Sequence, residues 1–159
     1  MKYVIGIDIG GTNLRIGTVD EEGNLTNFER KSSESLVSEG AVENLGNEVK
    51  SYIERYKLEG RVGAISVGVP SMVSKDKSFI YSTPNLKGLE NIDLGHLLGD
   101  YVNIPVFVDR DVNYLLVNDI KTHGLDPDRE RTILGFYLGT GFGNAVYING
   151  QLHVGKNGV

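Results

Sequence analysis

The sequence has no cysteine and no tryptophan among its 159 residues. Without cysteine it has neither a disulfide framework nor a thiolate metal site, which agrees with a reducing compartment. Lysine and arginine form no run and the net charge is −5, so the chain lacks the electrostatic footprint of a protein that binds nucleic acid or an anionic membrane. No stretch approaches the roughly 18 apolar residues that a membrane span needs. We therefore expect a cytoplasmic protein with a small-molecule ligand and with no nucleic-acid or membrane partner.

The apolar residues, 40% of the chain, are arranged as in an α/β protein. Residues 3–9 and 13–19 are predicted to be strands joined by a turn, and residues 25–31 to be a third strand of the same meander. From residue 35 to residue 57, apolar side chains recur at three- and four-residue steps, which predicts a helix that covers the meander. The side chains on this helix face are Val42, Leu45, Val49, Tyr52, Ile53 and Tyr56.

The middle of the chain continues the alternation of strands and helices. The apolar run at 62–69 predicts a strand buried on both faces inside a mixed sheet, and the charged stretch at 74–78 predicts a turn. A short helix is predicted over 92–101, a strand over 104–109 and a further helix over 110–120. The side chains of the last helix that should face inward are Val112, Leu115, Leu116 and Ile120.

Residues 123–131 are polar and contain glycine and proline, which predicts a linker. After it, residues 132–139 and 143–150 repeat the strand, turn and strand of the opening hairpin, turn glycines included. We therefore expect residues 1–122 to form one lobe, and residues 132–159 to hold the first strands of a second, similar lobe.

The two glycine turns are candidate phosphate sites. Glycine can take positive φ and lets the backbone approach a ligand with no β-carbon in the way, so successive N–H groups can converge on phosphate oxygens. Hydroxyl and amide side chains beside the glycines add donors. The first turn contains Gly10, Gly11, Thr12 and Asn13, and the second contains Gly139, Thr140, Gly141, Gly143 and Asn144.

A simpler explanation of these glycines is that tight hairpins need them. The presence of two copies, each with hydroxyl and amide residues, favours an anion site. Neither turn fits a dinucleotide-binding loop, because that loop opens a helix whereas a strand follows each turn here. Neither turn is a Walker loop, since the sequence contains no Gly-Lys-Ser or Gly-Lys-Thr.

Asp8 and Asp111 are the candidate acidic residues of the site. Asp8 lies in an apolar run beside the first turn, where a carboxylate needs a compensating cation or hydrogen bonds. A Mg²⁺ ion that keeps its water shell and is shared with nucleotide phosphates would compensate it, and capping of the turn N–H groups is the alternative. Asp111 follows the strand at 104–109, where open α/β sheets bind ligands, and a helix N-terminus would stabilise the anion that accepts a proton. The residues alone leave open whether Asp111 is a general base or, like Asp109, a helix cap.

In order and spacing, DIGGTNLRIG at 8–17, RDVN at 110–113 and LGTGFGNAVYING at 138–150 resemble the N-terminal half of the ROK family of sugar kinases and repressors. The resemblance covers essentially the whole chain. It implies an actin-like ATPase (ribonuclease H-like) fold with a mixed sheet, with ATP and Mg²⁺ as cofactors. It also implies that Asp111 is the catalytic base and that residues 8–17 and 139–146 contact the phosphates. The Mg²⁺ bound through water that we expect at Asp8 would lie in the first of these motifs.

Within that family, residues 73–86 and 110–116 look most like the D-allose kinases. Most glucose-type members carry Asn immediately before the catalytic Asp, and this chain carries Arg110. Arg110 is therefore a candidate sugar-binding residue beside Asp111. Asn85 lies in the loop where the family binds sugar hydroxyls and is a candidate specificity residue, although it also fits a turn after proline. Asn113 is expected to shape the sugar site and not to catalyse.

The resemblance thus implies an ATP-dependent hexose kinase that acts on D-allose or a related hexose and forms a homo-oligomer. A sugar-sensing regulator of the same family is the alternative, but its helix-turn-helix segment would precede the first glycine turn, which begins at residue 10. The third alternative is an inactive fragment, because the family's Gly-Glu-x-Gly-His segment, zinc site and adenosine pocket would follow Val159. The three histidines are isolated, so we expect no metal site beyond that for Mg²⁺: His96, His123 and His153.

The strands predicted after the linker would present unpaired edges, which favour pairing with another copy of the chain. We expect the isolated chain to self-associate through residues 132–159, or to leave them unstructured. Sedimentation velocity over a concentration series, together with NMR linewidths of this segment, tests the prediction. A monomer in which the segment is well ordered would contradict it.

Overall fold

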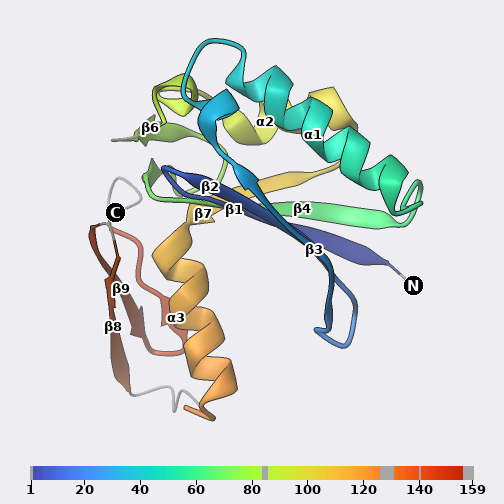
Figure 1. The fold of residues 1–159 in the computed structure, drawn as a ribbon. Coiled ribbons are helices and arrows are strands. Elements are labelled where there is room, and N and C mark those ends of the chain that lie inside the picture. The colour runs from blue at the N-terminus through green and yellow to red at the C-terminus, as the bar shows by residue number, and fades with distance from the viewer. Residues whose placement is uncertain (1, 84–85, 126–130, 140, 156–159) are drawn as a thin grey trace.

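The computed structural model describes residues 2–83, 86–125, 131–139 and 141–155. In these residues a five-stranded sheet carries two helices on one face and a third helix on the other, and a three-stranded sheet lies beside the third helix (Figure 1). This arrangement confirms the predicted α/β class.

The five-stranded sheet is mixed. β1 (Tyr3–Ile9) and β2 (Asn13–Val19) form the predicted hairpin, and β3 (Leu25–Ser32) completes the antiparallel meander. β4 (Val62–Val69) and β7 (Val106–Arg110) are parallel to β1, and the strand order is β3-β2-β1-β4-β7. The carboxyl ends of β1, β4 and β7 therefore lie together at one end of the sheet, where open α/β sheets place their ligands.

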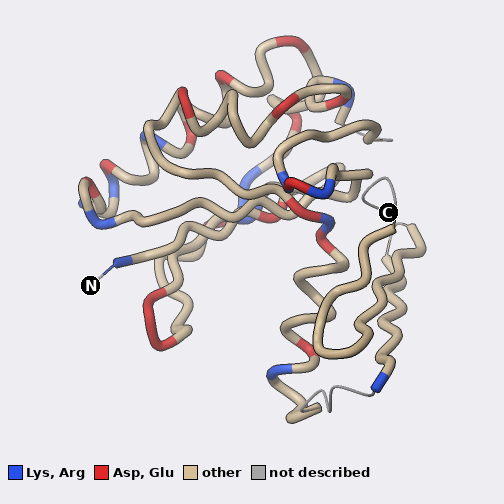
Figure 2. Tube along the Cα trace, turned by 180° about the vertical axis from the view of Figure 1, so that it is seen from behind, with Lys and Arg blue, Asp and Glu red and all other residues tan. Residues whose placement is uncertain are grey.

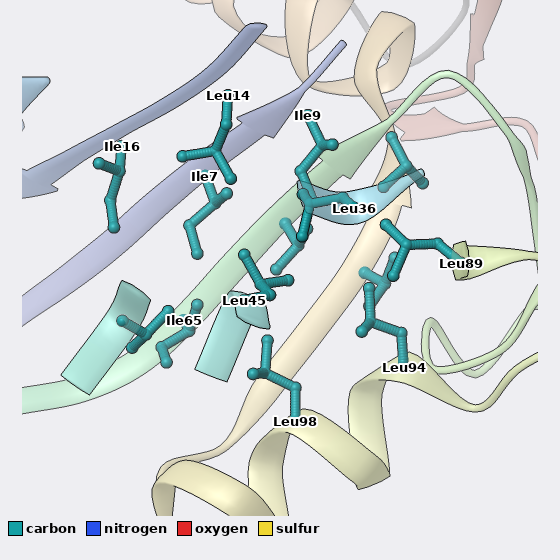
Figure 3. Packing of buried hydrophobic residues seen from close by; sticks show 14 of the residues in the cluster. Ile7, Ile9, Leu14, Ile16, Leu36, Leu45, Ile65, Leu89, Leu94 and Leu98 are labelled. Atoms are coloured by element: carbon teal, nitrogen blue, oxygen red, sulfur yellow. The ribbon is translucent and has the colours of Figure 1, made fainter. Parts of the chain in front are cut away.

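Two helices, α1 (Ala41–Arg55) and α2 (Leu94–Val102), cover one face of this sheet and bury the main hydrophobic core with it (Figure 3). As predicted, α1 also covers the meander, and its Tyr52 hydroxyl donates a hydrogen bond to the carbonyl of Asn27 at 2.8 Å. The fully buried large side chains of the two helices are Leu45, Val49, Tyr52, Leu94 and Leu98.

The first helix begins later than the apolar periodicity predicts. A 3₁₀ turn occupies Glu34–Leu36, and Gly40 adopts a left-handed φ of 82° immediately before α1. A residue with this φ cannot belong to a right-handed helix, so it separates the turn from α1. Val42, Ile53 and Tyr56, predicted to face the core, are partly buried at its margin.

The apolar run of β4 predicts a strand that is buried on both faces, but the structure buries only part of its length in this way. Gly63 at its start is exposed, whereas Gly68 near its end is buried. The second face is covered where α3 (Asp111–Thr122) crosses the sheet, and there Ser66 Oγ donates a hydrogen bond to the Tyr114 hydroxyl at 2.8 Å. The second layer thus covers only the end of the sheet that carries the candidate site.

α3 packs against the three-stranded sheet with one face. Val112, Leu116 and Ile120 are buried as predicted, but Leu115 is 45% exposed. Asn113 is buried as well. The centre of the buried face of α3 therefore lies on the side of the helix away from Leu115. The inward orientation predicted for Leu115 is therefore wrong.

The three-stranded sheet consists of β8 (Thr132–Leu138), β9 (Phe142–Ile148) and β10 (Gln151–Leu152), in the order β10-β9-β8. β8 and β9 pair antiparallel through seven residues each, which repeats the β1–β2 hairpin as predicted. Of the predicted linker at 123–131, residues 126–130 lie outside the described residues, as do residues 156–159 of the last segment.

The three-stranded sheet differs from the rest of the chain in charge. Residues 132–155 contain no Lys, Arg, Asp or Glu, whereas charges of both signs are mixed along the five-stranded sheet and its helices (Figure 2). None of the helices in the described part of the chain is long and apolar enough to cross a membrane. The large exposed apolar side chains of the small sheet are Leu134, Phe136, Leu138 and Phe142.

Two neighbouring leucines on α2 allow the contribution of the core to be measured. Leu98 is fully buried (Figure 3), and Leu97 is 50% exposed. Leu98→Ala should lower the free energy of unfolding by about 2–5 kcal/mol, because it removes buried apolar surface and leaves a cavity. Leu97→Ala, with the same change in helix propensity, should change it by about 0.5 kcal/mol or less. Urea unfolding followed by circular dichroism measures both, and equal losses would show that α2 does not pack as described.

Candidate active site

Asp8 and Asp111 come together at the carboxyl end of the five-stranded sheet. Asp8 on β1 is in register with Gly68 on β4, and Gly68 is in register with Asp109 on β7, two residues before Asp111. A β-carbon on Gly68 would lie 3.6 Å from the Cα of Asp111 and 3.3 Å from the ring of Tyr114. The start of α3 thus lies directly over the strand that neighbours Asp8, with room for little more than a β-carbon at position 68.

Asp111 is half-buried, and its pKa is raised above the ordinary value of 3.8. Burial is the largest cause, and the negative charge of Asp8 raises the pKa further. The hydrogen bond from the Val112 N–H and the positive charge of Arg110 act in the opposite direction. The helix N-terminus was expected to favour the anion, but burial outweighs it here. A raised pKa makes the carboxylate a stronger acceptor for the proton of a hydroxyl.

Neither Asp109 nor Asp111 is the N-cap of α3, so the helix-cap alternative is wrong for both. The N-cap residue is Arg110, which makes no side-chain capping hydrogen bond. Each carboxylate instead accepts from the N–H of the next residue, at 2.8 Å from Arg110 to Asp109 and at 2.8 Å from Val112 to Asp111. The role of Asp111 as a base stays a prediction.

The carboxylate of Asp8 forms an ion pair with Arg15, at 2.5 Å between Nη1 and Oδ2. The two residues are opposite each other in the β1–β2 hairpin, on the sheet face away from Ile7 and Leu14, which belong to the core. Both side chains are partly exposed. Asp8 therefore bonds to Arg15 and not to the N–H groups of the turn, a pairing that sequence reasoning missed.

The metal role proposed for Asp8 agrees with the kind of ligand present. Among the described residues, no group of three or more His, Asp or Glu could hold an ion by itself. Mg²⁺ usually keeps several waters and binds one or two carboxylates together with substrate phosphates. A half-exposed carboxylate beside a glycine turn fits that mode, provided that Arg15 gives up its ion pair or shares it.

The first turn is closed by a hydrogen bond of 2.8 Å from Gly10 N to the carbonyl of Asn13. Neither Gly10 nor Gly11 has a positive φ, so the expectation that glycine supplies a left-handed conformation here is wrong. Thr12 is exposed, and the side-chain carbonyl of Asn13 accepts a hydrogen bond from Arg30 Nε at 2.9 Å. The amide of Asn13 is thus oriented by a second arginine at the edge of the turn.

The second turn lies against the start of α3. Gly139 N donates to the carbonyl of Gly141 at 2.9 Å, and the space around both α-carbons is open. A β-carbon on Gly143 would lie 2.4 Å from Cγ1 of Val112, so close packing explains this glycine. None of the three has a positive φ, which again corrects the expectation.

Two residues of the second turn are not placed beside Asp111. Thr140 lies outside the described residues. Asn144 is exposed. Its neighbours on β9, Gly143 and Ala145, face α3, and successive side chains of a strand point to opposite faces. The side chain of Asn144 therefore lies on the face of the small sheet away from α3.

Of the residues predicted to contact the sugar, two lie at the start of α3. Arg110 is half-buried and acts on Asp111 through its charge. Asn113 is buried and donates from Nδ2 to Asp109 Oδ1 at 2.7 Å, which agrees with a shaping role. Asn85 lies outside the described residues. Sequence reasoning missed Lys77, which forms an ion pair with the buried Asp109.

The electrostatic contact between the two carboxylates can be tested directly. Asp8→Asn should lower the pKa of Asp111, because a like charge is removed and Arg15 is left unpaired. The contribution of burial, the largest cause of the raised pKa, should remain. NMR titration of the side-chain carboxyl carbons measures the change. Asp20→Asn, which removes a charge from the exposed turn after β2, is the matched control, and equal effects of the two variants would contradict the convergence.

The chain is similar in sequence to curated sugar kinases. A glucokinase of Streptomyces coelicolor is 29% identical over 159 residues, which are 100% of this chain and 48% of that protein. An N-acetyl-D-glucosamine kinase of Haemophilus influenzae is 27% identical over 156 residues, 97% of this chain and 49% of that protein. The chain thus spans about half the length of the curated relatives it matches.

Solved structures show the same architecture. A ROK family glucokinase from Streptomyces griseus, in complex with glucose and AMPPNP, superposes with a TM-score of 0.80 at 27% sequence identity, over 99% of this chain and 48% of that one. The α/β fold with its mixed sheet is therefore that of the actin-like sugar kinases. The model of the ROK family matches residues 4–159. The chain belongs to the ROK family.

Proposed function

We propose that this chain forms part of an ATP-dependent hexose kinase, in which Asp111 takes the proton of the sugar hydroxyl that attacks the terminal phosphate. The observation that carries the proposal is the approach of Asp8 and Asp111 at the carboxyl end of the sheet, between two glycine turns. Relatives that are named as glucokinase and N-acetyl-D-glucosamine kinase support the same reaction class.

In this proposal the chain acts by placement and by charge, which is how most phosphoryl-transfer sites work. N–H groups of the two glycine turns, other than those of Gly10 and Gly139 that already donate within the turns, bind phosphate oxygens. The contact between Gly143 and Val112 sets the distance from the second turn to the base. Asp8 holds Mg²⁺ through water, and the bound ion would neutralise phosphate charge.

The base acts in a partly dry environment. Burial raises the pKa of Asp111, and this strengthens its carboxylate as a proton acceptor. Arg110 opposes that shift and so favours the ionised form that a base needs. Burial and the charge of Arg110 thus act in opposite directions on the pKa of Asp111.

For the sugar we propose D-allose or a related hexose. Support comes from Arg110, which stands where most glucose-type members of the family carry Asn. A long cationic side chain beside the base offers several N–H donors in a fixed fork, where an amide offers two donors and one acceptor. The relatives named above are a glucokinase and an N-acetyl-D-glucosamine kinase, so members of the family differ in the sugar for which they are named.

The test uses a full-length protein, in which this chain is joined to the half that its relatives have in addition. Asp111→Asn should lower sugar-dependent ADP production about 10²–10⁴-fold, the usual contribution of a general base, with sugar binding kept. Asp100→Asn, an exposed site on α2, is the matched control and should keep full activity. The same assay over a panel of hexoses should show D-allose or a close epimer ahead of glucose.

Retention of full activity in Asp111→Asn would refute the base assignment. An unsubstituted protein that binds a hexose but forms no ADP would refute the kinase function and favour a sugar sensor.

A further inference from the structure

Lys77 ties the turn between β5 (Met72–Val73) and β6 (Ile80–Ser82) to the edge strand β7. Its carbonyl accepts a hydrogen bond from Val108 N at 2.7 Å, and its ammonium forms an ion pair with Asp109. The backbone of Lys77 is left-handed, with φ of 61°, a conformation that costs free energy in a residue with a β-carbon. One residue thus joins the turn to β7 through both its main chain and its side chain.

The carboxylate of Asp109 is held almost entirely out of water. Its side chain is 7% exposed, whereas that of Lys77 is 39% exposed. A buried carboxylate is stable only when it is paired and hydrogen-bonded, and removal of one partner leaves an uncompensated charge. Lys77 supplies the charge, and two further donors, Arg110 N and Asn113 Nδ2, bind Oδ1 at 2.8 and 2.7 Å.

These two donors lie on either side of Asp111 in the sequence. Arg110 N precedes it and Asn113 Nδ2 follows it, so the carboxylate of Asp109 fixes both ends of the segment that presents the base. No side chain caps α3 at Arg110, the usual means by which the start of a helix is held. The position of the first helical turn therefore depends on Asp109, and the charge balance of Asp109 depends on Lys77.

We propose that Lys77 and Asp109 are positioning residues for Asp111, and that the turn at 74–78 and the base move as one unit. This inference rests on the function proposed above for Asp111. Neither residue needs to touch a substrate to affect the rate. A displacement of the base by about 1 Å is enough to change the rate of a reaction that depends on placement, with little effect on binding.

The main experiment compares two lysines of the same turn in the kinase described above. Lys77→Met should lower kcat about tenfold to a hundredfold and change KM for sugar and nucleotide less than about twofold. Lys75→Met, at an exposed position two residues away, should leave both parameters unchanged. Lys77→Arg keeps the charge and should restore most of kcat.

A second measurement uses the 159-residue chain alone. Amide hydrogen exchange at residues 108, 110 and 112 should accelerate in Lys77→Met and stay as in the parent chain in Lys75→Met. This readout does not depend on catalysis. If the unsubstituted kinase is inactive, the proposed function fails, and the exchange data still decide whether Lys77 holds the start of α3.

A double variant separates positioning from general stability. Lys77→Met with Asp109→Asn removes both charges, so no uncompensated carboxylate is buried, and we expect it to fold at least as well as Lys77→Met. A low kcat in this folded double variant would support positioning. Normal kcat per folded molecule in both Lys77→Met and the double variant, or unchanged exchange at residue 110, would overturn the proposal.

Discussion

The candidate site depends on how closely a helix can approach a strand at one point. At Gly68 the sheet has no side chain on the face that receives α3, and the Cα of Asp111 lies where that side chain would begin to make contact. A lone β-carbon there would be in ordinary contact with that Cα and slightly tight against the Tyr114 ring, so a side chain that extends beyond the β-carbon would push the first turn of α3 away from β1. The approach brings Asp111 close enough for the charge of Asp8 to raise its pKa, and Asp111 is half-buried there.

Much of this arrangement could be predicted from the residues. The opening hairpin, the helix that covers it, the parallel strands and the second hairpin all have clear periodicity, and the structure confirms them. The rule that ligands bind at the carboxyl ends of parallel strands selected Asp111 as a candidate, and the structure brings it near Asp8. Counting outward from the predicted turn would also have placed Arg15 opposite Asp8, and a glycine in an apolar strand is a known sign of close backbone approach.

Other features depend on contacts between distant segments, which periodicity does not reveal. The stretch at 74–78 reads as a solvated turn, yet Lys77 neutralises a carboxylate 32 residues later in the chain. The turn glycines suggested left-handed backbone, but the structure gives another reason for Gly143, the packing of β9 on Val112. Leu115 fits the apolar periodicity and is exposed, because the buried side of α3 is set by its two partners and not by the helix itself.

The contact between Gly143 and Val112 differs in kind from the ion pair of Asp8 and Arg15. The first is a limit set by atomic size, which neither salt nor proton concentration changes. The second joins partly exposed charges, whose attraction dissolved ions weaken. Ionic strength will therefore alter how strongly the candidate site attracts an anion, while the spacing between the second glycine turn and Asp111 stays the same.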